Sequence, residues 1–205
     1  MVKKNIYLLF ILFTFLMSCK PTKNMTIQEL ALINDAKIDV PFRVLTVDNE
    51  EDSLVLRKKA MDIDVNTITT NKPLKYFIER LKQTLIEEAG VGIAAPQVGL
   101  SRNLFLFLRL DRPDYPICVA INPRIVNVPK ETVCFEDDGC LSIPGESGTS
   151  IRYPWIEVEY YNEKGELIKE KLSGYSRNED FTGIIFQHEF DHLQGVLFID
   201  KLCEK

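Results

Sequence analysis

The chain has 205 residues, of which 45% are hydrophobic and 27% are charged. This length and apolar content are enough for one domain with a sizeable core. The formal net charge is −5 and the sequence has no block of basic residues, which argues against nucleic acid as a partner.

The N-terminal segment has the pattern of an export signal. Lysines at positions 3 and 4 precede an apolar stretch at 6–17, which is too short to span a bilayer and has the length of a signal-peptide core. The Leu-Met-Ser-Cys sequence that ends at Cys19 resembles a bacterial lipoprotein signal, in which this cysteine becomes the lipidated first residue. Acyl chains on Cys19 would anchor the protein stably to a membrane.

We therefore predict a signal peptide at 1–19, a polar tether at 20–40 and a single folded domain at 41–205. The predicted location is the bacterial cell envelope. A membrane-attached N-terminal extension without lipid, or a cytoplasmic protein, is the alternative.

The first predicted elements of the domain are a helix and two strands. Residues 71–89 have one apolar stripe with proline in the opening turn, and Gly90 follows as a stop. Residues 103–110 form a nearly unbroken apolar run that predicts a buried strand. Turn residues at 111–116 lead to a second strand that ends near Val128.

The last part of the chain predicts a hairpin and a second helix. Strands at 156–161 and 166–172 flank a turn, and the final helix is expected to run from Asn178 to Gln194 with Gly195 as its stop. The order of elements predicts an α+β fold in which mixed, largely antiparallel strands surround this helix.

Both histidines of the chain fall in the final helix, within His188-Glu189-Phe190-Asp191-His192. Side chains four residues apart share one helical face, so both imidazoles can reach one metal ion. The intervening Glu189 can move a proton of an attacking water, so H-E-x-x-H predicts a metal-dependent hydrolase. The short string also occurs by chance, and a pair of surface histidines is the competing interpretation.

A catalytic metal of this kind needs a third protein ligand, and only thirteen residues follow His192. The metzincin pattern fails because Phe198 stands where that pattern has its third histidine. The remaining candidates are upstream cysteines and carboxylates, among which Cys140 stands in a glycine-bounded segment. Cys118, Cys134 and Cys203 are expected to pack or to cap rather than to bind the metal. With Cys140 as a ligand and Cys19 lipidated, at most one disulfide can form.

Three motifs in this order resemble peptide deformylase, the hydrolase that removes the formyl group from N-terminal formyl-methionine. They are Gly-Val-Gly-Ile-Ala-Ala-Pro-Gln-Val-Gly at 90–99, Asp-Gly-Cys-Leu-Ser at 138–142 and Gln-His-Glu-Phe-Asp-His-Leu-Gln-Gly at 187–195. The resemblance extends from about residue 54 to 202, so the domain at 41–205 is expected to be a peptide deformylase catalytic domain with a H-E-x-x-H helix amid antiparallel sheets.

The resemblance implies a role for individual residues. Cys140, His188 and His192 would hold one divalent ion, which the family resemblance suggests is Fe2+, with Zn2+, Ni2+ or Co2+ as alternatives. Glu189 would accept the proton of the attacking water and pass it to the leaving amine. The Gln97 side-chain amide and the Leu141 backbone N–H would stabilise the oxyanion.

The backbone and the methionine side chain of the substrate are each expected to contact a separate group of residues. Gly90 and Gly92 would let the backbone of a peptide approach closely. The methionine side chain needs an apolar pocket, and helical spacing places suitable side chains there. The predicted pocket residues are Val91, Phe181, Ile184 and Ile185.

One position departs from the family pattern, because Asp138 stands where the family usually has glutamate. The resemblance implies that this carboxylate pairs with Arg152 and holds the cysteine loop. Glu136 is the alternative partner of Arg152. Aspartate is one methylene shorter, so we expect altered geometry of the loop before any loss of the metal.

Export conflicts with the usual task of such an enzyme, since formylated nascent chains are cytoplasmic. An exported member would act as a monomer on formyl-methionyl peptides or proteins outside the inner membrane. Thiolate-bound ferrous iron is easily oxidised there, which favours Zn2+. The alternatives are a related exported metallo-amidase or peptidase, and a catalytically inactive lipid-anchored protein that binds metal or peptide.

Overall fold

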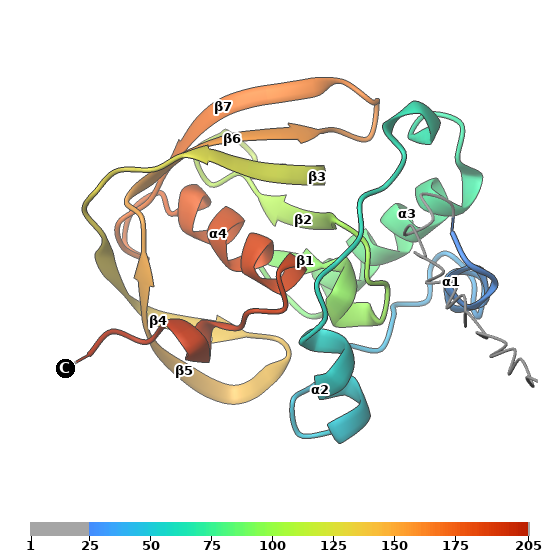
Figure 1. Cartoon of the computed structure of the whole chain (residues 1–205), viewed down its shortest axis with the longest axis horizontal. Helices are drawn as coiled ribbons and strands as arrows, with labels where there is room; N and C mark the ends of the chain where they lie inside the picture. The colour runs from blue at the N-terminus through green and yellow to red at the C-terminus, as the bar shows by residue number, and fades with distance from the viewer. Residues whose placement is uncertain (1–24, 205) are drawn as a thin grey trace, which may run out of the picture.

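The computed structural model describes residues 25–204, and the predicted signal peptide with Cys19 lies outside them. The strands form a five-stranded sheet in the order β1-β2-β3-β6-β7 and a separate two-stranded sheet of β4 and β5 (Figure 1). All these strand pairs are antiparallel. The predicted α+β class is therefore confirmed.

The elements have the following bounds. The helices are α1 Ile27–Ile33, α2 Glu50–Leu56, α3 Lys72–Glu87 and α4 Thr182–Leu193, with short 3-10 helices η1 Val65–Thr67, η2 Ala95–Val98 and η3 Phe198–Lys201. The strands are β1 Gly92–Ala94, β2 Leu104–Leu108, β3 Ile117–Asn127, β4 Val133–Cys140, β5 Ile143–Arg152, β6 Trp155–Tyr161 and β7 Leu167–Ser173. Within residues 25–204, none of the helices has the length and apolar character needed to traverse a bilayer.

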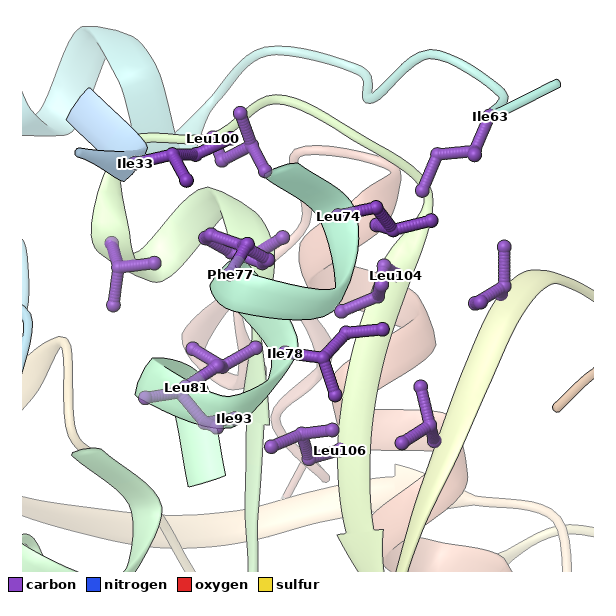
Figure 2. Close-up of a cluster of buried hydrophobic side chains, with 14 of the residues drawn as sticks. Ile33, Ile63, Leu74, Phe77, Ile78, Leu81, Ile93, Leu100, Leu104 and Leu106 are labelled. Atoms are coloured by element: carbon purple, nitrogen blue, oxygen red, sulfur yellow. The ribbon is translucent and has the colours of Figure 1, made fainter. Parts of the chain in front are cut away.

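Strand β2 separates two apolar layers. Its side chains alternate between the faces of the sheet, so Leu104 and Leu106 pack with α3, whereas Phe105 and Phe107 pack with α4. Figure 2 shows Leu104 and Leu106 on the side of Leu74 and Ile78 of α3. Because both faces are covered, the strand is apolar throughout, which is why its sequence is an almost unbroken apolar run.

Helix α3 closely matches its prediction. The side chain of Asn71 accepts a hydrogen bond from Leu74 N at 3.0 Å and caps the helix, and Pro73 lies in the first turn. The predicted apolar stripe is buried except for Ile86, which is 61% exposed. The helix therefore covers one face of the sheet and ends directly before the glycine segment that leads into β1.

Helix α4 lies against the other face, next to β1 and β2 (Figure 1). It begins at Thr182, so the predicted start near Asn178 is wrong. Asp180 accepts hydrogen bonds from the backbone N (2.9 Å) and the hydroxyl (2.6 Å) of Thr182. This carboxylate therefore provides an acceptor for the first backbone N–H of the helix. Eleven of its twelve residues are buried, so the motif helix is the central helix of the fold.

Residues 25–40 differ from the predicted tether. Thr26 and Glu29 form a capping box that starts α1, and Ile33 is fully buried. Glu29 also forms an ion pair with the buried Arg102, with Nε–Oε1 at 2.6 Å. The buried Ile33, the pair of Glu29 with Arg102, and the hydrogen bond from Arg80 Nη1 to Ile33 O at 3.0 Å thus attach this short helix to the domain, although its sequence is mostly polar.

A disulfide between Cys134 and Cys203 joins β4 to the C-terminal segment, 69 residues later. The same segment is hydrogen-bonded to β5 through Cys203 N and Thr149 O at 2.9 Å. Cys118 and Cys140 are free thiols. The expectation of at most one disulfide alongside a metal-binding Cys140 agrees with this arrangement within residues 25–204.

Replacing Cys203 with serine is expected to lower the free energy of unfolding by about 2–5 kcal/mol, because the disulfide restricts the unfolded chain. For a domain of this size the melting temperature should fall by about 2–4 °C per kcal/mol. Thermal unfolding of the variant measures the effect, and Cys118→Ser, which removes a free thiol, is the matched control. Equal melting temperatures for the Cys203 variant and the wild type would contradict the prediction.

Candidate active site

Three side chains that can bind a metal ion converge where β4 ends against α4. The ligand atoms of Cys140, His188 and His192 all lie within 4.8 Å of one another, and Cys140 Sγ is 3.2 Å from His192 Nε2. Burial disfavours ionisation of Cys140, but the two imidazoles outweigh it and hold the pKa of the thiol well below its usual value. A thiolate and two imidazoles, nearly buried at this spacing, fit a tetrahedral metal ion.

The imidazole of His188 is oriented by Asp138. Its Nδ1 lies 2.9 Å from Asp138 Oδ1, which leaves Nε2 available for a metal ion. Burial raises the pKa of Asp138, but hydrogen bonding to His188 and the charges of His188 and Arg152 hold it well below the usual value. The aspartate is therefore an ionised acceptor that fixes both the position and the tautomer of this histidine.

Arg152 is buried between two carboxylates and connects the two sides of the centre. Its Nη2 donates to Asp138 Oδ2 and its Nη1 to Asp191 Oδ2, each at 2.6 Å. The shorter side chain at position 138 still reaches the arginine, so Asp138 and not the exposed Glu136 is the partner. Burial disfavours the charge on Arg152, yet the two carboxylates raise its pKa.

Ser150 on β5 also contacts Asp138, a contact that the sequence did not suggest. Its hydroxyl donates to Asp138 Oδ2 at 2.5 Å and accepts from Arg152 Nε at 3.1 Å. The serine is fully buried. It thus fills space between the short aspartate and the arginine, and all three groups hold the strand that ends at Cys140.

Glu189 lies beside the three candidate ligands and is 4% exposed. Burial raises the pKa of its carboxyl to about 7, although the neighbouring His188 and His192 act in the opposite direction. Within residues 25–204, its Oε2 has no hydrogen-bond partner. A carboxyl with this pKa and an oxygen without a hydrogen-bond partner can accept and release a proton near neutral pH, as general acid–base catalysis requires.

Gly92 on β1 contacts Glu189 directly. A Cβ at this position would lie 2.5 Å from Glu189 Oε1 and 2.8 Å from its Cγ, which is closer than atoms can approach. The glycine of the first motif therefore gives space to the carboxylate, besides any role in binding a peptide. The spacing of the motifs gave no sign of this contact.

Gly92→Ala is expected to lower kcat by about 10- to 100-fold, because displacing a catalytic group by about 1 Å can cost this much. Metal content should not change, since the glycine does not touch the three ligands. Steady-state kinetics together with metal analysis of the purified variant test both statements. Wild-type turnover in the alanine variant would show that Glu189 tolerates the displacement.

Gln97 lies across the site from Glu189 in the 3-10 helix η2. Its Oε1 accepts from Ala94 N at 2.8 Å, so the amide group is fixed with Nε2 pointing toward Cys140 Sγ at 3.7 Å and Ser142 Oγ at 3.2 Å. Leu141 directly follows the cysteine and lines the same pocket. Both residues thus lie beside the candidate ligands, where their N–H groups could donate to an oxyanion.

A pocket of about 440 Å³ opens beside these groups. All six residues predicted to bind the substrate line it: Gly90, Val91, Gly92, Phe181, Ile184 and Ile185. Phe135 and Arg177 also line the pocket and were not predicted. Phe135 comes from β4, which sequence patterns did not identify as a strand, and Arg177 comes from the loop before α4.

The fold and the site together define a metal-dependent hydrolase of the H-E-x-x-H class with a cysteine as the third candidate ligand. The family model of polypeptide deformylase matches residues 41–205. The chain belongs to this family.

Relatives and solved structures agree with this assignment. The chain is 41% identical to a peptide deformylase of Thermotoga maritima over 148 residues, which cover 72% of this chain and 81% of that protein. Peptide deformylase 2 of Nostoc is 43% identical over 136 residues, which cover 63% and 72% of the two chains. The crystal structure of the Thermotoga maritima enzyme superposes with a TM-score of 0.67 at 36% identity and covers 80% of this chain and 99% of that one.

A peptide deformylase of Acinetobacter baumannii, solved with Met-Ala-Ser bound, has a TM-score of 0.68 at 30% identity and covers 80% and 99% of the two chains. The protein is therefore a peptide deformylase-type enzyme, which hydrolyses the linear amide of N-terminal formyl-methionine and releases formate. This reaction is a step of protein biosynthesis, the processing of N-terminal methionine. Neither a peptidase nor an inactive binding protein is favoured by these relatives.

Proposed function

We propose that Cys140, His188 and His192 hold one divalent ion and that Glu189 moves the protons of formyl-methionine hydrolysis. The convergence of one cysteine and two histidines beside a buried glutamate carries this proposal. The ion, when bound, would polarise the formyl carbonyl and make a water more acidic. Glu189 accepts a proton from the attacking water and then gives it to the nitrogen of the leaving methionine.

The remaining residues of the site bind and orient the substrate. Gln97 Nε2 and the Leu141 N–H would donate to the oxyanion that forms on the formyl oxygen. The methionine side chain would enter the apolar part of the pocket between Ile184, Ile185 and Phe181. The peptide backbone would lie along the edge strand β1, which has no strand partner on its outer side among residues 25–204.

A thiolate with two imidazoles binds both iron and zinc. We propose Fe2+ if the protein works in a reducing compartment, and Zn2+ if it works in an oxidising one, where thiolate-bound ferrous iron is easily oxidised. Full-length protein purified without oxygen should contain one ion per chain and should turn over formyl-Met-Ala-Ser. Acetyl-Met-Ala-Ser and an internal peptide bond should be poor substrates. Faster cleavage of either would favour the alternative amidase or peptidase.

We further propose that the enzyme acts in the cell envelope as a monomer with a lipid on Cys19. The lipoprotein-like sequence before Cys19 supports this location, and the Cys134–Cys203 disulfide suits an oxidising compartment. The substrates there would be formyl-methionyl peptides or exported proteins. Fractionation of cells should place the full-length protein in the membrane and Cys19→Ser in the soluble fraction or in the unprocessed form, whereas Cys118→Ser should behave like the wild type.

A further inference from the structure

Arg177 lies at the pocket, yet neither the metal nor the oxyanion chemistry uses it. Its side chain is exposed, and it belongs to the loop between β7 and α4. Within residues 25–204 this arginine forms no ion pair. A cation at a substrate pocket without a carboxylate partner is available for a charge on the substrate.

The guanidinium of Arg177 is held in place by contacts that leave one end free. Nε donates to the backbone oxygen of Asp137 at 2.9 Å, and Nη2 donates to the same oxygen. The group also lies 5.5 Å from the ring centroids of both Phe135 and Phe181. These contacts fix the side chain, while Nη1 has no hydrogen-bond partner among the described residues.

Phe181, directly before α4, indicates which part of a substrate Arg177 can reach. Phe181, which contacts the guanidinium, precedes the candidate ligand His188 by seven residues, or about 10 Å at the helical rise of about 1.5 Å per residue. An extended peptide advances about 3.3 Å per residue. The separation of Phe181 from His188 therefore corresponds to about three residues of an extended substrate, and Arg177 lies beside Phe181.

The pocket lining carries exposed side chains of both charges, so the charge of a substrate group decides where along the lining it binds. Glu88, at the end of α3, lines the same pocket and would repel a carboxylate, whereas Arg177 would attract one. We propose that Arg177 is a specificity-determining residue that binds a carboxylate on the second or third residue of a formyl-methionyl peptide. The carboxylate is the C-terminus of a short peptide or an acidic side chain, and the proposal rests on the deformylase activity of the site.

The test compares three substrates with the full-length metal-loaded enzyme: formyl-Met-Ala-Ser with a free C-terminus, the same peptide with a C-terminal amide, and formyl-Met-Ala-Asp amide. The wild type should prefer the free tripeptide over its amide by about fivefold in kcat/KM, which is the upper range for an ion pair near the surface. The difference should lie in KM. A preference for the Asp amide over the Ser amide would identify an acidic side chain as a second source of the carboxylate.

Arg177→Gln should remove the preference by lowering kcat/KM for the free acid to that for the amide, whereas Arg177→Lys should retain part of it. Arg124→Gln, which removes an exposed arginine of β3 paired with Asp62, is the matched control and should keep the wild-type preference. High salt should reduce the preference of the wild type. The proposal fails if the wild type does not distinguish acid from amide, or if Arg177→Gln still does; turnover of the neutral amide tests the deformylase activity separately.

Discussion

Glu189→Ala is expected to lower kcat by about 10²- to 10⁴-fold while the metal content remains that of the wild type, because the variant loses proton transfer and keeps all three ligands. The glutamate is 4% exposed and burial raises its pKa to about 7, so the wild-type carboxyl can accept and release a proton near neutral pH. Turnover of formyl-Met-Ala-Ser and metal analysis of the same preparation give both values.

Two further variants serve as comparisons for Glu189→Ala. Glu189→Gln retains the size of the side chain and should be as inactive as the alanine variant, because an amide does not accept the proton. Cys140→Ala should lose both metal and turnover. An active Glu189→Ala enzyme would disprove the role of this residue, whereas loss of metal from it would make the glutamate a part of the metal site.

Arg152→Ala is expected to lower the free energy of unfolding by about 3–5 kcal/mol, since it leaves two buried carboxylates without their shared cation. Asp138 and Asp191 are 4% and 6% exposed. Without the arginine, Asp138 would also hold His188 less rigidly, so we expect weaker metal binding. Chemical denaturation of the metal-free protein and metal titration measure the two effects separately.

The contacts of Asp191 supply a control for this prediction. Lys201 pairs with the other oxygen of Asp191 at 2.6 Å but is 40% exposed, so Lys201→Ala should cost only about 0–1 kcal/mol. Arg152→Lys keeps the charge but cannot contact both carboxylates in the same way. Unchanged stability, metal content and turnover in Arg152→Ala would refute the structural role of this residue.

The sequence predicted secondary structure best where one regular pattern determines the local structure. Helix α3 has a cap, an early proline and an apolar stripe, and β2 is apolar because both of its faces are buried. The group of three candidate metal ligands was predicted because two histidines share a helical face and few other donors remained. The role proposed for each site residue rests on the family resemblance combined with this geometry.

Other features depend on contacts between distant segments, which no local pattern contains. Helix α1 is attached by Ile33 and by the pair of Glu29 with Arg102, and its polar sequence alone suggests a tether. The hairpin of β4 and β5 has bulged registers, so its residues do not alternate regularly. The contact of Ser150 with Asp138 arises only once these two strands pair.

The attachment of α1 has a consequence for how far the enzyme could extend from a membrane. The capping residue Thr26 is the seventh residue after Cys19. If Cys19 carries the lipid, the seven residue steps from Cys19 to Thr26 can span at most about 25 Å when fully extended. Under the proposed lipid anchor, the catalytic domain would remain close to the bilayer surface, and peptides emerging at that surface would reach the enzyme before those free in the surrounding solution.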